Sequence, residues 1–467
     1  MIDSVTFRPQ SNGSNRIVNP ADLALMAWTA QDYQEQQSRY TALRDWYNGV
    51  HNVPLTPRQK QYLERTSLFR FAVNYLRLPV ELCVERLTVE GFDGPEGIGG
   101  EGGILDEWWT SGRLDALQNQ VHRAAIRDGD TYLLVEWDKD EGRPVFSHEP
   151  AHDGDEGMKV HYLSNLRREM TMASKVWTEH RFNDRGMVDA TRRLNLYMPD
   201  RIERYVEKGK NWERYEEPGY PWPIPNPIGH IPVIHFRWKD DGGNWGESEL
   251  DQLITLQELI NKASLDELEV ADSSAFHRLV ITGMNAPQET ISFAVNDVIF
   301  IGGEAGKDVG VTVVPANDLS QLRAQVFALV TRMAQIAHIP LQYFISTSQM
   351  PAADSQAADD TQLTAKVKSE SVALGNAWED AMYIALKMNK AYTGGRDLER
   401  GENIETRWSE FGRVDPMAVE ERRAAIVQAL SAAGLGVEGI VTLPALGYSE
   451  EEQAALLQTD AVTGVGQ

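Results

Sequence analysis

The sequence predicts an α+β protein organised around two long helices that are separated by a short β-rich segment. Apolar residues recur at three- and four-residue steps over residues 247–272 and again over 317–339, which is the spacing of one apolar stripe on an α-helix. Alternating patterns typical of strands lie between the two helices and before them. The two stripes consist of Leu250, Leu253, Ile254, Leu256, Leu259, Ile260, Ala263 and Leu268, and of Leu319, Leu322, Val326, Leu329, Val330, Met333 and Ile336.

Local signals mark the ends of both helices. Ser248 and Asp251 form a capping-box pattern at the start of the first helix, and Asn317 or Asp318 is an N-cap for the second. Pro340 ends the second helix. Helices of roughly 22 residues span about 33 Å, so we expect two struts that lie side by side.

Each helix also has a face of small and neutral polar side chains. Contact with a neighbouring subunit and exposure to solvent are both compatible with such a face. Its residues are Gln257, Asn261, Ser264, Gln325, Thr331 and Gln335.

Composition limits the classes of function. The 467 residues suffice for several folding units. A formal net charge of −24 argues against tight DNA binding, which uses Lys and Arg clusters, although an acidic protein can still surround DNA. Cys83 is the single cysteine, which excludes an intramolecular disulfide and fits folding in a reducing cytoplasm. Because there is neither a long apolar run nor a basic-then-apolar leader, we expect no membrane span and no signal-directed secretion.

Residues 1–246 are predicted to form a mixed α+β domain. After a polar arm over residues 1–20, helical patterns cover 21–48, 71–87 and 105–127, and a strand pattern covers 88–92. The strands predicted next are residues 131–137, 144–148, 160–163, 176–182, 192–197, 202–206, 212–216 and 232–236, and the proline-rich stretch 221–232 is an extended connector.

The rest of the chain alternates between short strands and helices. Between the two long helices, strands are predicted at 278–282, 291–293, 298–301 and 309–314. Residues 342–359, rich in Ser, Thr, Gln and Ala, predict a long loop. A helix about 50 Å long follows over residues 360–392. The last segment is predicted to be helical, with helices over 417–433 and after Ser449.

Two glycine-rich stretches lack the residues of a phosphate-binding loop. Residues 97–103 carry Glu101 and no Lys-Ser/Thr pair, so we interpret them as a linker. Residues 302–308 place Asp308 where a magnesium-binding hydroxyl would stand, so we interpret them as a turn.

A cluster of potential metal ligands lies in a predicted hairpin. Its spacing matches no tetrahedral or helical metal motif, so an acidic loop is the favoured interpretation and no metal site is predicted. The cluster comprises His148, Glu149, His152, Asp153, Asp155, Glu156 and His161.

Basic and aromatic residues interleave over residues 192–215. Proteins that bind single-stranded nucleic acid use this combination, but the neighbouring glutamates neutralise most of the charge, and a solvated antiparallel sheet produces the same pattern. We favour the sheet. The residues are Arg192, Arg193, Arg201, Arg204, Lys208, Lys210 and Arg214 with Tyr197, Tyr205, Trp212 and Tyr215.

Several short motifs occur in a characteristic order over about residues 21–446. They are Leu43-Arg44-Asp45-Trp46-Tyr47-Asn48-Gly49, Glu85-Arg86-Leu87-Thr88-Val89-Glu90-Gly91-Phe92, Gly129-Asp130-Thr131-Tyr132, Gly229-His230-Ile231-Pro232-Val233, Trp245-Gly246-Glu247-Ser248-Glu249-Leu250 and His338-Ile339-Pro340. In this order of parts, the sequence resembles the portal proteins of tailed bacteriophages, of the siphophage type.

The resemblance implies a portal fold and a twelve-subunit ring around a DNA channel at one capsid vertex. Many relatives have a Ser-Gly-x-Ala step near the end of the tunnel loop, where this chain has Ser355-Gln356-Ala357-Ala358. The implied parts are a wing (1–246), a first stem helix (247–272), a clip (273–316), a second stem helix (317–339), a tunnel loop (340–359), a long wing helix (360–394) and a helical crown (395–467).

The resemblance also implies a set of functional residues, none of them catalytic and none binding a cofactor. The channel residues are Gln342, Ser346, Thr347, Ser348, Gln349 and Ser355. The stem residues are Leu250, Leu253, Leu259, Asn261, Leu322, Val326, Leu329 and Met333. The clip residues that contact terminase or an adaptor are Arg278, Asn296, Asp297 and Lys307.

The implied partners are the terminase large subunit, a head-completion or adaptor protein, the major capsid protein and scaffold, and the double-stranded DNA that passes through the ring. The implied location is the virion, with the host cytoplasm during assembly. Uncharged loop residues suit a channel in which DNA slides, because each strong phosphate contact adds a barrier to movement. A closed ring needs a heterologous interface between copies.

Two other functions remain as alternatives. Long helices also suit a helical scaffold or assembly protein, although the β content argues against it. A metal-dependent nuclease would use His148, His152 and Asp155. Whether isolated rings have twelve or thirteen copies, and which phage and host are involved, stays open at this stage.

Overall fold

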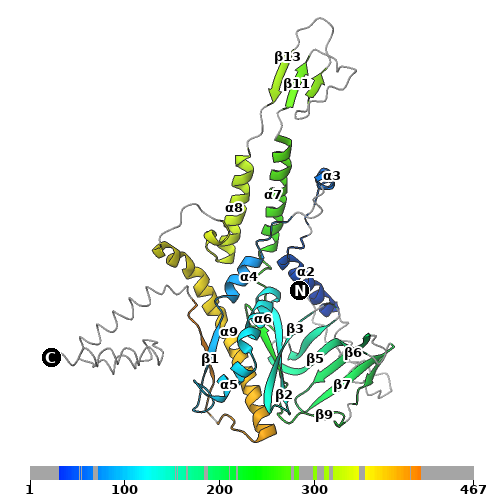
Figure 1. The fold of residues 1–467 in the computed structure, drawn as a ribbon, viewed down its shortest axis with the longest axis vertical. Helices are drawn as coiled ribbons and strands as arrows, with labels where there is room; N and C mark the ends of the chain where they lie inside the picture. Colours follow the sequence, from blue (N-terminus) through cyan, green and yellow to red (C-terminus); the bar gives the residue numbers. More distant parts are fainter. Residues whose placement is uncertain are drawn as a thin grey trace, which may run out of the picture. The chain divides into compact units, whose positions relative to one another are not determined.

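The computed structural model has mixed helix and sheet, as predicted (Figure 1). No helix in the described part of the chain is both long and apolar enough to cross a membrane. The predicted strand 291–293, the glycine-rich stretch 302–308 and the C-terminal helices after residue 411 lie outside the described residues. The structure describes residues 31–51, 53, 55–66, 72–152, 154, 156–164, 167–182, 188–209, 211–216, 219–274, 278–282, 298–301, 310–314, 319–345, 353–399 and 401–411.

A three-stranded antiparallel sheet lies at the centre of the core. Its order is β10-β2-β3, and it consists of β10 (Val233–Arg237), β2 (Asp130–Asp138) and β3 (Arg143–Pro150). The first six residues of β2 are all buried, because helices α6 (Leu114–Asp128) and α9 (Ala353–Thr393) pack against the sheet. Consecutive buried residues in a strand indicate that both of its faces are covered.

A second, six-stranded antiparallel sheet follows in the chain. Its order is β4-β5-β6-β7-β8, with β9 paired to β7. Its inner side is apolar, with Val176, Leu194, Leu196, Tyr205 and Trp212 in one cluster. The strands are β4 (Gly157–Ser164), β5 (Arg167–Phe182), β6 (Val188–Tyr197), β7 (Arg201–Lys208), β8 (Asn211–Arg214) and β9 (Ile224–Pro225).

The N-terminal helices differ from the prediction in three places. The helix predicted over 71–87 is only α4 (Arg77–Val84), and the one predicted over 105–127 is two helices, α5 (Ile104–Ser111) and α6. Arg113 between them has φ 53°, a left-handed conformation that interrupts a helix. Helix α3 (Pro57–Thr66) was not predicted, and α2 (Gln31–Tyr47) precedes it. Strand β1 (Val89–Asp93) pairs with β14 (Glu405–Trp408).

The first long helix, α7 (Ile254–Ser274), begins later than predicted. The capping contact forms, since the Ser248 N–H donates to Asp251 Oδ2 at 3.2 Å. However, the Ser248 hydroxyl donates to the backbone oxygen of Arg127, and the Glu249 N–H donates to that of Ile126. These bonds to the end of α6 hold residues 248–249 outside the helix.

The remaining elements follow the predicted order with two differences: α9 begins earlier, and strand β14 lies within residues 395–467, which were predicted to be helical. Strands β11 (Arg278–Thr282), β12 (Val298–Ile301) and β13 (Gly310–Val314) form a sheet of order β12-β11-β13, and α8 (Ser320–Ala337) follows. After the 3₁₀ turn η1 (Leu341–Tyr343), α9 begins at Ala353 instead of residue 360. Alanines at 353, 357 and 358 favour helix there, so the loop predicted over 340–359 is shorter.

Two of the motifs quoted above meet in the core beside β2. The buried Asp130 carboxylate accepts hydrogen bonds from the Gly246 N–H (2.8 Å) and from the Tyr40 hydroxyl (3.0 Å), and it contacts His235 Nε2 at 2.8 Å. A Cβ on Gly246 would lie 2.2 Å from the backbone oxygen of Gly129, so a glycine is required at that position. Asp130 thus connects α2, β2, β10 and the segment that leads into α7.

Trp378 of α9 is the centre of the aromatic core. Its ring centroid is 5.0 Å from that of Phe236 on β10 and 5.3 Å from that of Trp109 on α5. Its Nε1–H donates to His122 Nε2 at 2.9 Å, and His122 Nδ1 lies 3.0 Å from the Leu87 backbone oxygen, which can only accept. His122 is therefore neutral with the proton on Nδ1, and burial lowers its pKa to about 4.

We expect His122 to make stability fall as the pH falls. Above about pH 6.5 the ring is neutral in both states, but between there and about pH 4 only the unfolded chain binds the proton. His122→Gln keeps a donor and an acceptor without titrating. The difference in free energy of unfolding, wild type minus variant, should drop by about 2 kcal/mol between pH 7 and pH 5 in urea titrations. An unchanged difference would contradict the assignment.

Candidate functional site

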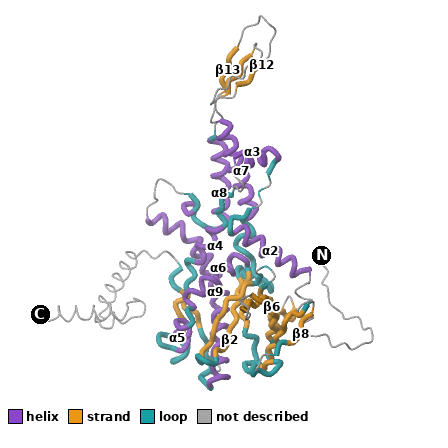
Figure 2. Tube along the Cα trace, turned by 45° about the vertical axis from the view of Figure 1, so that its right-hand side comes forward, coloured by secondary structure: helices purple, strands orange, loops and turns teal. Residues whose placement is uncertain are grey.

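Helices α7 and α8 pack side by side, as their apolar periodicity predicts (Figures 1 and 2). Ile260 of α7 and Val330 and Met333 of α8 are almost completely buried, at the end of the pair where α7 begins and α8 ends. Further along, Arg323 Nε of α8 donates to Glu267 Oε1 of α7 at 2.9 Å. The helix pair is therefore a defined unit of packing within the chain.

The predicted stem residues divide into buried and exposed groups. Leu250 and Leu253 are buried but precede α7, Leu329 and Met333 are buried on α8, and Leu322 and Val326 are half-buried. Leu259 does not belong to the packed stripe, because 46% of its surface is exposed. Three large apolar side chains are thus exposed on the helix pair, namely Leu259, Phe327 (50%) and Ile336 (46%).

Two polar residues of α7 that were predicted to lie on its polar face are buried. Gln257 and Asn261 are fully buried, so they are not available to a neighbouring subunit. The Gln257 Oε1 accepts from the Tyr75 N–H at 2.9 Å, and the Asn261 Oδ1 accepts from the Val73 N–H at 2.9 Å. Asn261 Nδ2 lies 2.8 Å from His51 Nδ1. These amides satisfy the backbone of an irregular segment and attach it to α7.

The segments at the base of the helix pair are joined by a buried ion cluster. Glu249 is 2% exposed and pairs with Lys366 of α9 at 2.5 Å and with Lys239 at 3.2 Å. A third contact comes from Trp238, whose Nε1–H donates to Glu249 Oε2 at 3.2 Å. Lys366 also donates to the backbone oxygen of Ala337 at the end of α8, at 2.9 Å. One carboxylate and one ammonium therefore connect the segment that leads into α7, the end of α8 and the N-terminal half of α9.

A second cluster brackets the loop between α8 and α9. The Tyr343 hydroxyl donates to Asp360 Oδ2 at 3.2 Å, and Arg86 Nη2 lies 3.3 Å from the same oxygen. Tyr343 belongs to η1, Asp360 to α9, and Arg86 follows α4. The two sides of residues 344–359 are thus attached to one carboxylate.

The predicted channel residues are only partly described. Gln342 lies half-buried in η1, and Ser355 lies in α9 instead of the loop. Ser346, Thr347, Ser348 and Gln349 lie outside the described residues.

The predicted clip residues are described even less. Arg278 begins β11, and nothing further is described for its side chain. Asn296, Asp297 and Lys307 lie outside the described residues. Their assignments remain predictions.

The histidines of the potential metal loop point to different partners. His148 Nε2 lies 2.8 Å from the Thr131 hydroxyl, His152 Nε2 lies 3.1 Å from that of Thr41, and His161 Nε2 lies 3.1 Å from that of Ser174. Within the described residues no group of three His, Cys, Asp or Glu side chains is arranged to hold a metal ion. Asp153 and Asp155 lie outside them. Nothing in the described geometry favours the nuclease alternative.

The other buried titratable groups near the ion cluster serve the core. Burial raises the pKa of the Cys83 thiol to about 12, so the thiol is protonated and a poor nucleophile. Burial acts to lower the pKa of Lys366, but the charge of Glu249 and its hydrogen bond to the ammonium outweigh burial and raise that pKa, so Lys366 stays charged.

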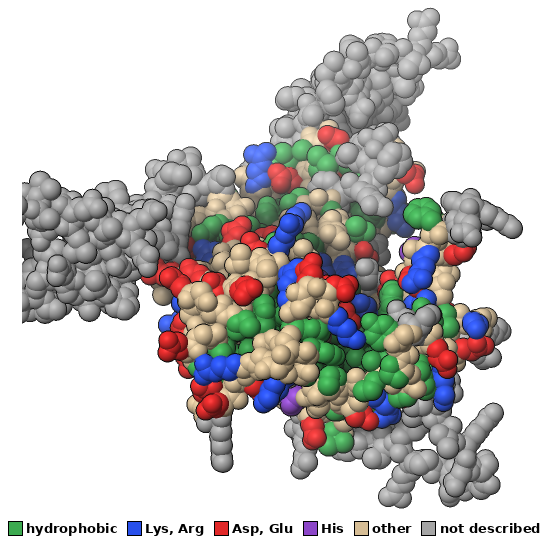
Figure 3. All heavy atoms as spheres, turned by 60° about the horizontal axis from the view of Figure 1, so that its bottom comes forward, with side chains coloured by type: hydrophobic (Ala, Val, Ile, Leu, Met, Phe, Trp, Pro, Cys, Tyr) green, Lys and Arg blue, Asp and Glu red, His purple; other side chains and the backbone are tan. Residues whose placement is uncertain are grey.

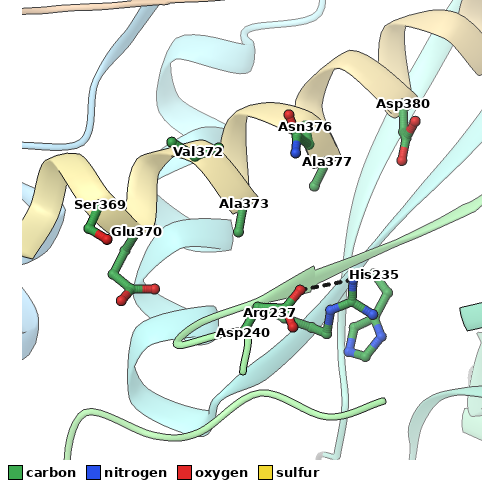
Figure 4. A pocket seen from close by; sticks show the side chains of 10 residues that line it. All are labelled: His235, Arg237, Asp240, Ser369, Glu370, Val372, Ala373, Asn376, Ala377 and Asp380. Atoms are coloured by element: carbon green, nitrogen blue, oxygen red, sulfur yellow. Dashed lines mark ion pairs between the residues drawn. The ribbon is translucent and has the colours of Figure 1, made fainter. Parts of the chain in front are cut away.

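Two of the surface cavities in the described part of the chain lie against the two large sheets. One, of about 350 Å³, lies between β10 and α9, where Arg237 pairs with Asp240 at 3.2 Å below Glu370, Ala373 and Asp380 (Figure 4). The other, of about 290 Å³, lies on the six-stranded sheet. Acidic, basic and apolar side chains intermingle over the described face in Figure 3.

The family of the chain follows from its comparison with known proteins. Residues 27–411 match the family model of the phage portal proteins described as SPP1 Gp6-like. The chain therefore belongs to this family of phage portal proteins.

A curated relative and two solved structures are similar over most of their length. The portal protein of Mycobacterium phage L5 is 20% identical over 355 residues, which are 71% of this chain and 68% of that protein. A chain in the neck of an empty gene transfer agent (GTA) particle is 14% identical with a TM-score of 0.39, and the match covers 87% of this chain and 95% of that one. A chain in the virion of the native GTA particle is 14% identical with a TM-score of 0.36, and that match covers 94% of this chain and 98% of the other.

We expect the Glu249 cluster to be a large contributor to stability. Lys366→Met keeps the apolar part of the side chain but leaves the buried Glu249 carboxylate with Lys239 as its remaining cation, so the free energy of unfolding should fall by about 3 kcal/mol. Lys262→Met, which breaks the partly exposed pair with Asp266, should cost about 0.5 kcal/mol or less. Urea unfolding of both variants provides the measurement. Equal losses would show that the cluster does not hold the base of the helix pair.

Proposed function

We propose that the chain assembles into a closed ring of twelve copies at one capsid vertex, with a central channel for double-stranded DNA during packaging and ejection. The observation that carries this proposal is membership of the portal family over residues 27–411. In this proposal residues 1–246 and 360–394 form the wing, α7 and α8 the stem, and the segment 273–316 the clip. The crown, named from the sequence as residues 395–467, is reduced to residues 410–467, because β14 pairs with β1 of the wing.

The exposed apolar residues of the helix pair support contact between copies. Leu259, Phe327 and Ile336 are 46%, 50% and 46% exposed. Contact with a neighbouring copy would remove these apolar side chains from water, which is favourable. In a ring, the face of one copy meets a different face of the next, so each copy contributes both halves of a repeated contact.

The charge of the chain supports a channel that lets DNA slide. With a formal net charge of −24, the assembled walls would repel phosphates instead of binding them. We assign the narrowest point to Gln342, Ser346, Thr347, Ser348 and Gln349, whose uncharged side chains release no counterions on contact with DNA.

Docking to other proteins follows from the same assignment. The clip, with Arg278, Asn296, Asp297 and Lys307, would bind the terminase large subunit during packaging and a head-completion or adaptor protein afterwards. The wing would face the major capsid protein and scaffold. The protein would pass from the host cytoplasm into the virion as the particle assembles.

Ring formation is tested by electron microscopy and native mass spectrometry of the purified chain. We expect particles with a central hole and a mass of twelve copies. Phe327→Asp should lower the assembled fraction at least tenfold, because a charge at an apolar contact costs about 1.4 kcal/mol or more. Phe182→Asp is the matched control, since Phe182 is 81% exposed on β5. Equal ring formation by both variants would show that Phe327 of the stem is not at the contact between copies. A monomeric wild type would contradict the proposed ring.

The channel assignment is tested by adding charge to the loop. Changing Ser346, Thr347 and Ser348 together to Lys should slow DNA packaging, and the slowing should decrease as salt increases, because counterion release is salt-dependent. Packaged DNA protected from nuclease is the readout. Ser111→Lys, on the exposed end of α5, should package at the wild-type rate. Unchanged packaging by the loop variant would place the narrowest point elsewhere.

A further inference from the structure

One face of the six-stranded sheet carries a cavity that the proposed ring does not use. Alternate residues of neighbouring strands form this face: Lys175 of β5 lies opposite Asn195 of β6, and Trp177 lies opposite Arg193. The cavity has a volume of about 290 Å³ and is also lined by Tyr215, which follows β8. It contains part of the basic and aromatic pattern seen in the sequence.

Arg193 is the central group of the cavity. The residue is 8% exposed, its Nε and Nη2 donate to Glu179 Oε2 at 2.9 and 2.7 Å, and its guanidinium carbon lies 3.7 Å from the centre of the Tyr215 ring. Its Nη1, however, is buried with no hydrogen-bond partner among the described residues. A buried N–H group without an acceptor is unfavourable, and native proteins rarely leave one unpaired. Glu179 and Tyr215 therefore hold the guanidinium in place, and its Nη1 group still lacks an acceptor.

The surrounding charges select the acceptor. Four cationic side chains (Lys175, Arg181, Arg193, Arg204) and two anionic ones (Glu136, Glu179) line the cavity, an excess of positive charge in a strongly acidic protein. Lys175 is already paired, at 2.5 Å, with Glu149.

A singly charged acceptor fits this environment best. Hydrogen bonds from Arg193 and Arg181 lower the pKa of Glu179 against the opposing effect of burial, so Glu179 is charged. Attraction to the cations and repulsion by Glu179 both scale with the charge of the ligand, but the cost of taking an ion out of water rises with the square of its charge, so a carboxylate with one charge enters a partly enclosed cavity more easily than an anion with two.

The aromatic groups indicate what accompanies the charge. Trp177 and Tyr215 are both half-buried at the cavity, so each leaves part of a flat apolar surface exposed. We infer that the cavity binds a carboxylate of a protein segment, a side chain or chain terminus next to an apolar or aromatic residue, through Arg193 Nη1. This inference does not depend on the proposed ring.

Calorimetric titration of the full-length protein tests the site. The probe is N-acetylphenylalanine, which has one carboxylate beside an aromatic ring, and its neutral amide is the matched ligand. We expect one probe per chain and binding of the amide at least about tenfold weaker, because hydrogen bonds to charged groups contribute more than neutral ones. Inorganic phosphate should bind more weakly than the carboxylate.

Protein variants separate Arg193 from general charge. Arg193→Lys keeps a positive charge beside Glu179 but removes the Nη1 group, and should weaken binding of the probe at least about tenfold. Arg192→Lys changes the neighbouring residue, whose side chain alternates to the opposite face of β6, and should leave binding unchanged. Trp177→Leu, which leaves the Arg193–Glu179 pair intact, should also weaken the probe. Equal binding of acid and amide, or no binding by the wild type, would overturn the inference.

Assembly distinguishes the two sources of the carboxylate. If Arg193→Lys forms fewer oligomers in native mass spectrometry while its unfolding midpoint is unchanged, a second copy of this chain provides the carboxylate. If oligomers are unchanged and the probe still binds the wild type as expected, the carboxylate belongs to a different protein.

Discussion

The buried carboxylate of Glu249 is the interaction on which the arrangement of the long helices depends. Taking a carboxylate out of water is expensive unless cations and donors replace the water. Here the replacements come from Lys366, Lys239 and Trp238. Since Lys366 also binds the last turn of α8, the charges must be brought together at the same time as the three helices. The base of the helix pair is thereby fixed to the core, and the position of both helices follows from it.

The elements with strong local signals were predictable. Strands β11 and β12 have the predicted bounds, and β10 and β13 lie within one residue of theirs, because β-branched residues bounded by turn residues leave little choice. Helix α3 was missed although its start has a signal. Gln59 and Thr56 exchange two hydrogen bonds there, with Pro57 at the first helical position, which is a capping box.

The buried faces of α7 were not predictable from periodicity alone. Leu259 fits the apolar stripe and is exposed, whereas Gln257 and Asn261 look like surface residues and are buried. Their partners are the backbone of residues 73 and 75, roughly 180 positions away in the chain. No local pattern reveals that an irregular segment will need two amides. For the same reason Glu249 could be quoted within a motif, but its pairing with Lys366 could not be foreseen.

The cluster of Arg86, Tyr343 and Asp360 has a mechanical consequence. Tyr343 precedes the segment 344–359 and Asp360 follows it, and the two are joined through Asp360 Oδ2, which also contacts Arg86. A force on that segment is therefore transmitted to the end of α4, to η1 and to α9 together. It reaches the core without first bending α8. An anchorage of this kind lets a chain segment be pushed repeatedly while the frame that carries it keeps its shape.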